Sequence, residues 1–209
     1  MSERRTSYNT IKDRAIGEII EKKSRFIANV IHIESEEEAI SHIEKIKKEN
    51  WDARHNCYAY ILGKDGETVR FSDDGEPSGT AGKPMLEVLQ KRELTEVLVV
   101  VTRYFGGVLL GTGGLARAYT DATIEGLENG KLQTLRLYQT VSLTLDYGMV
   151  GAVKNILSKE DIITISENYM ENVVMEIGLL IEDKDIILSK ITNATNGKAK
   201  IEPGDEIFI

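Results

Sequence analysis

Apolar residues along the first half of the chain recur with the spacing of strands and helices in turn. Residues 15–33 predict two strands joined by the polar turn EKKSR. Residues 35–50 predict a helix, because the apolar residues keep a helical spacing and Ser35 and Glu38 match a capping box. The other elements expected in this half are strands at 57–62 and 68–71, a helix at 84–92, a valine-rich buried strand at 96–102 and a helix at 115–130.

The second half repeats this alternation in the order strand, helix, strand, strand, helix, strand. The expected strands lie at 140–147, 162–166, 173–181 and 198–209, and the expected helices at 149–160 and 184–197. This βαββαβ order is the split βαβ pattern of ferredoxin-like domains. We therefore predict an α+β protein with two domains, residues 1–133 and 134–209, that meet near Lys131–Tyr138.

Composition and charge narrow the range of functions. The 209 residues carry a net charge of −8, and both halves are acidic, with 19 basic against 22 acidic residues up to Leu135 and 7 against 12 after it. This balance argues against coating nucleic acid through bulk charge but leaves room for a local basic site. No apolar run could span a bilayer, the first residues lack a signal-peptide core, and the single cysteine fits a reducing compartment. We expect a cytoplasmic protein with no membrane or DNA partner, and leave its oligomeric state open.

Glycines gather between the buried strand and the last helix of the first half, in RYFGGVLLGTGGLARA (residues 103–118). Glycine lets a backbone approach a ligand, and free N–H groups at a helix start favour anions such as phosphate. Arginines flank the segment on both sides and add permanently charged donors. We predict an anion-binding or backbone-contact face; the alternative is that the glycines serve only a tight turn and close packing. The candidate residues are Arg103, Gly106, Gly107, Gly113, Gly114 and Arg117.

Two named nucleotide motifs come close to matching and are rejected. GTGGLA, from Gly111, fits the dinucleotide fingerprint G-x-G-x-x-A, but it lies several residues after its strand, and no second parallel strand ending in an acid follows. GTAGKP resembles a P-loop ending, but Pro77 stands at the first glycine and Pro84 replaces the Mg²⁺-binding hydroxyl residue.

An acidic segment, SDDGEPSGTAGKP (residues 72–84), is the second candidate. Asp73, Asp74 and Glu76 are three carboxylates within four positions, a pattern that can hold Mg²⁺ or Ca²⁺ or supply a close pair for acid–base chemistry. The alternative is a solvated turn, because Asp-Gly and Glu-Pro are turn dipeptides. Thr80 and Lys83 add a hydroxyl and a cation. We predict that this segment and the glycine segment converge on one face, because both follow strand-like segments of the same half.

A third candidate is ARHNCYAY, which contains Arg54, His55 and Cys57. The histidine and the cysteine could act together. Two positions apart on a strand, they face the same side, so a Cys–His pair is conceivable. A buried cysteine beside a structural histidine is the commoner case. With only three histidines in the chain, we do not expect a zinc site.

The stretch GKPMLEVLQKRELTEVLVVVTRYFGGVLLG resembles the signature of the Impact family, whose bacterial members are called YigZ-like proteins. The blocks KSRFIA, HNCYAY and FSDDGEPSGTAG are similar to other blocks of that family, in the expected order. The resemblance covers roughly residues 10–130, and the second half is similar to the C-terminal domain of the bacterial branch. The signature positions are Gly82, Met85, Leu86, Leu89, Leu94, Val100, Val101, Arg103, Tyr104, Phe105, Gly106, Gly107, Leu110 and Gly111.

The resemblance implies a fold and a broad role. It implies the fold of the second domain of ribosomal protein S5 for the first domain, and that of the ferredoxin-like end domain of elongation factor G for the second. Eukaryotic relatives regulate translation by competing for an activator of an initiation-factor kinase. They carry an RWD-type module in front, which we do not expect here, so this competition does not transfer automatically.

Three functional hypotheses follow. The leading one is a non-enzymatic, translation-linked regulator that contacts RNA, the ribosome or a translation factor. In it Arg103, Lys83 and Arg117 meet phosphates, Tyr104 or Phe105 stacks on a base, and Thr80 and His55 also contribute. The alternative is an enzyme or binder for a small phosphorylated ligand, with Mg²⁺ held by the acidic segment and phosphate by GTGGLA. The third is a protein-interaction module whose glycines are structural. No other cofactor and no catalytic residue is expected.

Overall fold

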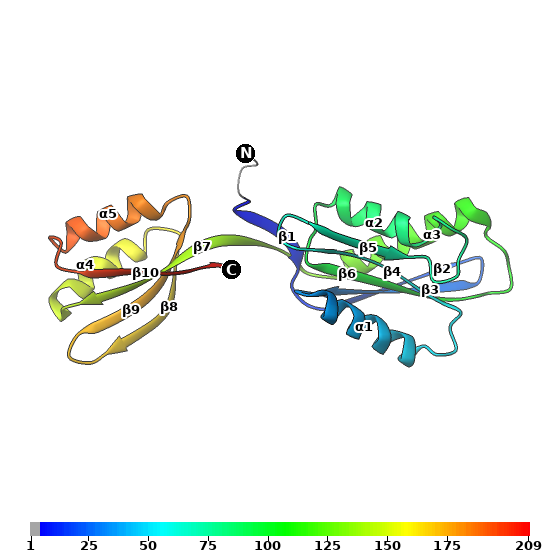
Figure 1. Cartoon of the computed structure of the whole chain (residues 1–209), viewed down its shortest axis with the longest axis horizontal. Helices are drawn as coiled ribbons and strands as arrows, with labels where there is room; N and C mark the ends of the chain where they lie inside the picture. The colour runs from blue at the N-terminus through cyan, green and yellow to red at the C-terminus, as the bar shows by residue number, and fades with distance from the viewer. Residues whose placement is uncertain (1–4) are drawn as a thin grey trace. The chain divides into compact units, whose positions relative to one another are not determined.

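The computed structural model describes residues 5–209, which separate into two compact units (Figure 1). The first unit ends at Thr134 and the second runs from Leu135 to Ile209. Among the described residues no helix has the length and apolar character needed to cross a membrane.

The first unit is a five-stranded antiparallel sheet with helices on both faces (Figure 1). Its strand order is β2-β3-β6-β4-β5. A further short strand, β1 (Ser7–Ile11), was not predicted and lies beside the start of β7. The sheet strands and helices are β2 (Ala15–Glu21), β3 (Ser24–His32), α1 (Glu36–Glu49), β4 (His55–Leu62), β5 (Thr68–Ser72), α2 (Gly82–Lys91), β6 (Val97–Tyr104) and α3 (Gly111–Glu128).

The central strand β6 is buried on both faces, which explains its continuous apolar run. Val97, Val99 and Val101 belong to the core under α2 and α3. Leu98 and Val100 point the other way, into the core under α1. Side chains alternate along a strand, so the next residue of the first series, Arg103, shares the face of α2 and α3 at the carboxyl end of the strand.

Helix α3 begins four residues earlier than expected, at Gly111 rather than Leu115. Gly113 and Gly114 therefore lie inside the first turn and not in a loop before it. Each glycine costs a helix about 1 kcal/mol relative to alanine, which is why the sequence pattern favoured a later start. Packing of the following turns, through Leu115 and Tyr119 among others, offsets this cost.

The second unit is a four-stranded sheet with two helices packed on one face. The strands are β7 (Leu132–Leu145), β8 (Ile162–Tyr169), β9 (Val173–Leu180) and β10 (Lys200–Phe208), and the helices α4 (Tyr147–Leu157) and α5 (Lys184–Ala194). Their order in the sheet is β10-β7-β9-β8, and every neighbouring pair is antiparallel. This is the arrangement expected of the βαββαβ pattern, so the α+β class and the ferredoxin-like second domain are confirmed. Strand β7 starts eight residues before its predicted start and continues from the first unit into the second.

Strand β2 and helix α3 approach each other backbone to backbone. A Cβ built on Gly17 would lie 2.3 Å from the backbone nitrogen of Gly126. No side chain can relieve such a contact by changing rotamer, so one of the two elements must shift. This approach fixes α3, and with it the start of the helix near Arg103, against the sheet.

Replacing Gly17 with alanine is expected to lower the free energy of unfolding by about 1–3 kcal/mol, because the added methyl meets backbone. Equilibrium urea unfolding measures the change. Gly151→Ala in α4 is the matched control, because a Cβ there meets no atom within 4 Å. A Gly17→Ala protein as stable as the wild type would contradict the close contact.

Candidate functional site

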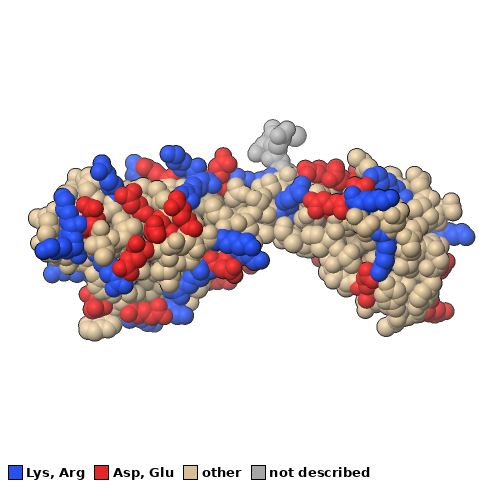
Figure 2. All heavy atoms as spheres, turned by 180° about the vertical axis from the view of Figure 1, so that it is seen from behind, with Lys and Arg blue, Asp and Glu red and all other residues tan. Residues whose placement is uncertain are grey.

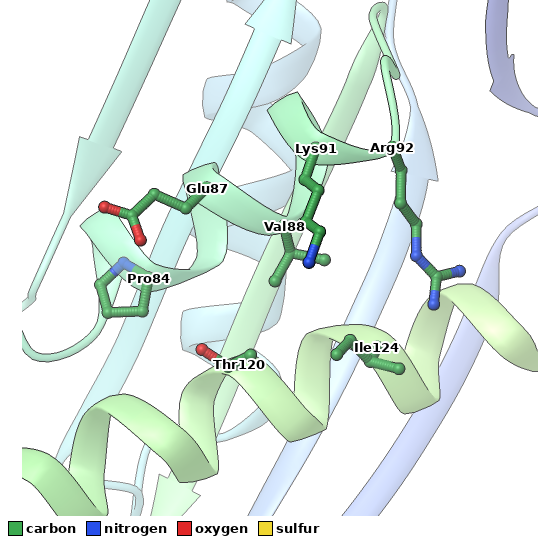
Figure 3. A pocket seen from close by; sticks show the side chains of 7 residues that line it. All are labelled: Pro84, Glu87, Val88, Lys91, Arg92, Thr120 and Ile124. Carbon is green, nitrogen blue, oxygen red and sulfur yellow. The ribbon is translucent and has the colours of Figure 1, made fainter.

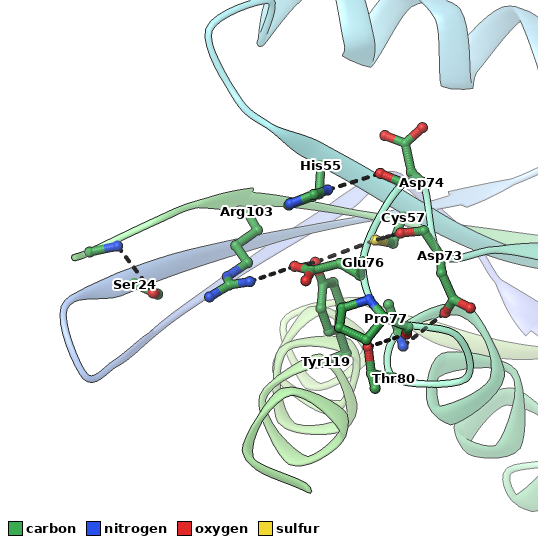
Figure 4. A network of polar contacts seen from close by, with 12 residues as sticks. Ser24, His55, Cys57, Asp73, Asp74, Glu76, Pro77, Thr80, Arg103 and Tyr119 are labelled. Atoms are coloured by element: carbon green, nitrogen blue, oxygen red, sulfur yellow. Dashed lines mark hydrogen bonds and ion pairs between the residues drawn. The ribbon is translucent and has the colours of Figure 1, made fainter. Parts of the chain in front are cut away.

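The acidic segment and the glycine segment line one hollow of about 490 Å³ at the carboxyl end of β6. The predicted convergence of the two segments is therefore confirmed. Figure 4 shows the polar side chains that meet there, with Arg103 reaching from the sheet toward Glu76. The lining residues are Arg54, His55, Gly75, Glu76, Pro77, Arg103, Phe105, Leu109, Leu110, Gly111, Thr112 and Leu115.

A buried ion pair joins the two segments. Arg103 Nη1 donates to Glu76 Oε1 at 2.7 Å, and the two side chains are only 7% and 3% exposed. Taking two charges out of water is costly unless each keeps its partner. The pair therefore ties the acidic segment to the end of β6.

Behind the pair, a chain of hydrogen bonds continues into the core. Tyr119 donates its hydroxyl to Glu76 Oε1 at 2.8 Å, and the thiol of Cys57 lies 3.3 Å from that hydroxyl and 2.9 Å from the carbonyl of Asp73. Burial raises the pKa of Tyr119, and burial likewise raises the pKa of Cys57 to about 12. A thiol that stays protonated is a poor nucleophile. His55 instead shares a hydrogen bond with the carbonyl of Asp74, at 2.9 Å, so Cys57 and His55 do not form a catalytic pair.

The three carboxylates of the acidic segment serve three different partners. Asp73 accepts hydrogen bonds from the backbone N–H groups of Gly79, Ala81 and Gly82, and so fixes the start of α2. Asp74 pairs with Lys47 at 2.7 Å and accepts from the Asn56 backbone, and its carboxylate points away from Glu76 (Figure 4). Within residues 5–209 no group of three or more potential ligands is placed to hold a metal ion. Asp73, Asp74 and Glu76 thus do not converge on one point, and the hypothesis that they hold Mg²⁺ together is not supported.

Arg103 has one side-chain donor, Nε, that finds no acceptor in the described part of the chain. Its Nε is buried and has no hydrogen-bond partner among the described residues, while Nη1 is held by Glu76. The guanidinium carbon lies 5.4 Å from the ring centre of Phe26 and 5.6 Å from that of Phe105. In contrast, the exposed Arg25 uses Nε and Nη2 together to hold both oxygens of Glu18. The buried Nε of Arg103 has no such acceptor among the described residues, and an anion oxygen would supply one.

The start of α3 forms the wall of the hollow beside Arg103. Its N-cap residue, Leu110, makes no side-chain capping bond, and the first turn contains no acidic residue. The N–H groups of Gly111, Thr112 and Gly113 have no carbonyl partner within the helix, because they precede its first complete turn. Free N–H groups and the helix dipole make this end attractive to an anion.

The remaining predicted residues divide into those near the hollow and those away from it. His55 and Phe105 line it, and the Arg54 guanidinium lies 6.0 Å from the Phe105 ring. Tyr104 points to the other face of the sheet, where its hydroxyl bonds Asn50 and Asp52. Lys83 and Arg117 are exposed and outside the lining, so their predicted place in the site is not supported.

Several predicted residues have structural roles. Thr80 donates to the carbonyl of Pro77 at 2.6 Å within the acidic segment. Gly106 is required because a Cβ there would lie 2.0 Å from the backbone of Lys23. Gly107 has a positive φ, which favours glycine. A Cβ built on Gly114 would lie 3.1 Å from the Cβ of Leu110, which is a tight contact. Gly113 differs from all of these, because its φ is not positive and a Cβ there meets nothing within 4 Å.

Arg54, which belongs to the third candidate motif, also lines the hollow, whereas one residue of this arrangement was not predicted. Nothing in the sequence singles out Tyr119, whose hydroxyl reaches Glu76 only because α3 packs against the sheet.

A second hollow, of about 440 Å³, lies between α2 and α3 (Figure 3). It has an apolar floor that includes Val88 and Ile124, and Lys91 and Arg92 stand at its rim. Arg92 pairs with Glu128 at 3.2 Å. No buried polar atom without a partner lines it among the described residues, so it has less to offer a specific ligand.

Comparison with known proteins identifies the family. Residues 22–127 match the Impact N-terminal domain. The chain belongs to the IMPACT family. Residues 143–198 match a second domain, described as a domain of unknown function, DUF1949. The resemblance seen in the sequence is thereby confirmed.

The relatives extend over most of this IMPACT family chain. It is 41% identical over 203 residues to "IMPACT family member YvyE" of Bacillus subtilis, covering 97% of this chain and 94% of that protein. It is 38% identical over 160 residues to "IMPACT family member YigZ" of Escherichia coli, covering 76% and 78%. A crystal structure described as a hypothetical protein matches with a TM-score of 0.63 and 32% identity, over 95% of this chain and 97% of that one. "Protein IMPACT homolog" of Dictyostelium discoideum matches at 35% identity over 130 residues, 60% of this chain and 34% of that protein.

Replacing Glu76 with alanine is expected to lower the free energy of unfolding by about 3–5 kcal/mol, because it leaves the buried charge of Arg103 unpaired. Equilibrium denaturation measures this. Glu18→Ala, which removes the exposed partner of Arg25, is the matched control and is expected to cost no more than about 1 kcal/mol. Equal losses in the two variants would show that the Arg103–Glu76 pair does not hold the acidic segment in place.

Proposed function

We propose that this IMPACT family protein is a cytoplasmic, non-enzymatic regulator linked to translation, and that its first domain contacts single-stranded RNA through the hollow at the end of β6. The link to translation comes from kinship with the eukaryotic IMPACT proteins. The observation that supports the RNA contact is the guanidinium of Arg103, whose Nε has no hydrogen-bond partner in the described chain.

The hollow combines the two features that single-stranded nucleic acids require. Arg103, Arg54 and the start of α3 supply positive charge and donors for phosphate. Phe105 is 42% exposed at the same hollow and offers a face on which a base can stack. Stacking on an aromatic residue contributes about 1–3 kcal/mol per base and tolerates any sequence.

The overall charge argues for a local contact rather than a long basic track. The chain is acidic, and on the face seen in Figure 2 basic side chains are interspersed with acidic ones. With only two or three phosphates engaged, a plot of log affinity against log salt concentration is expected to have a slope of about −1.4 to −2.1.

The second candidate function is binding of a small phosphorylated ligand, because a hollow of about 490 Å³ could enclose one nucleotide. It predicts that a mononucleotide binds as tightly as an oligonucleotide. The RNA proposal predicts that the oligonucleotide binds more tightly, through contacts outside the hollow.

Replacing Phe105 with alanine is expected to weaken the binding of a fluorescent 12-nucleotide RNA about 5–150-fold, the equivalent of one lost stacking contact. Arg54→Ala is expected to weaken it less and to make the salt slope shallower by about 0.7. Fluorescence anisotropy at several salt concentrations measures both.

The matched controls are Phe71→Ala and Arg70→Ala. Phe71 is 47% exposed on β5 and lies outside the hollow, as does its neighbour Arg70. The proposal fails if the wild-type protein does not bind the RNA at low salt, or if the control variants weaken binding as much as the site variants do.

A further inference from the structure

We infer that the hollow receives a terminal phosphate, namely the 5′-monophosphate end of a single-stranded RNA, rather than an internal phosphodiester. The inference rests on the proposed function and specifies which part of the RNA the site recognises.

The first observation is the open start of helix α3. The helix has eighteen residues, no side-chain cap from Leu110 and no acidic residue in its first turn. Its first two residues, Gly111 and Thr112, form part of the lining of the hollow, and N–H groups in the first turn have no carbonyl partner within the helix. A phosphate oxygen placed there would take the hydrogen bonds that a capping side chain normally supplies.

The second observation is Gly113, which the fold does not require. Its φ lies outside the left-handed region, and a Cβ would meet no protein atom within 4 Å. Gly17 and Gly106, in contrast, are held by backbone contacts. Gly113 does not itself line the hollow but directly follows Thr112, which does. A helix-weakening residue there, without a packing reason, is explained if its missing side chain leaves the neighbouring backbone N–H groups open to a ligand.

The third observation is independent of the helix. The Arg103 side chain is more than nine-tenths buried and lines the hollow, and its Nε is unpartnered. Glu76 accepts the hydrogen bond from Nη1, so the guanidinium cannot rotate to offer Nε to Glu76 without breaking that bond. A phosphate oxygen at Nε would supply the acceptor that this donor lacks in the protein.

These donors fit a terminal phosphate better than an internal one. A monoester has three free oxygens and more negative charge, whereas a phosphodiester has two free oxygens and one charge. The helix start, Arg103 and Arg54 provide donors from three separate elements, α3, β6 and the residues before β4. A concave site also suits the end of a chain, because an internal phosphate has nucleotides on both sides. The first base would then lie beside Phe105.

The test compares the same eight-nucleotide RNA with a 5′-phosphate and with a 5′-hydroxyl, by fluorescence anisotropy with the dye at the 3′ end. The full chain is expected to bind the phosphorylated RNA at least 10-fold more tightly. Gly113→Ala is expected to remove this preference while leaving the thermal stability unchanged or higher. Gly151→Ala, a helix glycine in α4 with equal space around it, is expected to keep the preference.

The outcomes separate the two proposals. Equal binding of the two RNAs overturns the terminal-phosphate inference and leaves the RNA proposal standing. A phosphate preference that survives in Gly113→Ala also overturns it, because the phosphate then lies elsewhere. No binding of either RNA overturns both proposals. If adenosine monophosphate binds as tightly as the phosphorylated RNA, the site is assigned to a small phosphorylated ligand. The proposal that the phosphate belongs to an RNA end is then wrong.

Discussion

The buried pair of Arg103 and Glu76 determines both how the acidic segment folds and what the hollow can bind. Glu76 lies in a turn-rich segment that has little apolar surface of its own, and the pair connects it to the end of a fully buried strand. Tyr119 adds a hydrogen bond from helix α3 to the same carboxylate oxygen. Strand β6, the acidic segment and helix α3 are therefore connected through one atom, Glu76 Oε1. Displacing any one of the three would break a hydrogen bond to that atom.

The same pair explains why an acidic protein can carry an anion site. Glu76 neutralises Arg103 and, by holding Nη1, restricts the orientation of a guanidinium whose Nε has no partner among the described residues. Stacking against Phe26 and Phe105 restricts the plane of the group further. Such preorganisation lowers the entropy cost of binding, so a few well-placed donors can act where the net charge of the chain is unfavourable.

Much of the fold was accessible from the sequence, because periodicity and turn chemistry fix the elements. The continuous apolar run of β6 required a strand covered on both faces, and the βαββαβ order specified the second sheet. Helix α3 was placed too late because glycine propensity opposes its true start, and only tertiary packing reverses that preference. The early part of β7 was missed because it is a mixed polar segment that pairs with β1, a strand too short to recognise.

The site was predictable in position but not in its pairing. Topology placed the acidic and glycine segments at one end of the sheet. The partners of individual carboxylates depend on side-chain directions that a sequence does not contain. Asp73 accepts hydrogen bonds from backbone N–H groups at the start of α2, and Asp74 pairs with Lys47, although their spacing resembled a metal-binding cluster. Tyr104 and Phe105 are adjacent in the chain, yet only Phe105 lines the hollow.

The most direct measurement is the ¹H–¹⁵N resonance of the Arg103 Nε–H group, assigned through its proximity to the ring of Phe26. In the free protein we expect a slowly exchanging signal, because the group is buried and has no partner. On saturation with 5′-phosphorylated RNA the proton resonance should move downfield, as expected for a new charge-assisted hydrogen bond. A signal that stays in place while the RNA is bound would contradict the central role of Arg103.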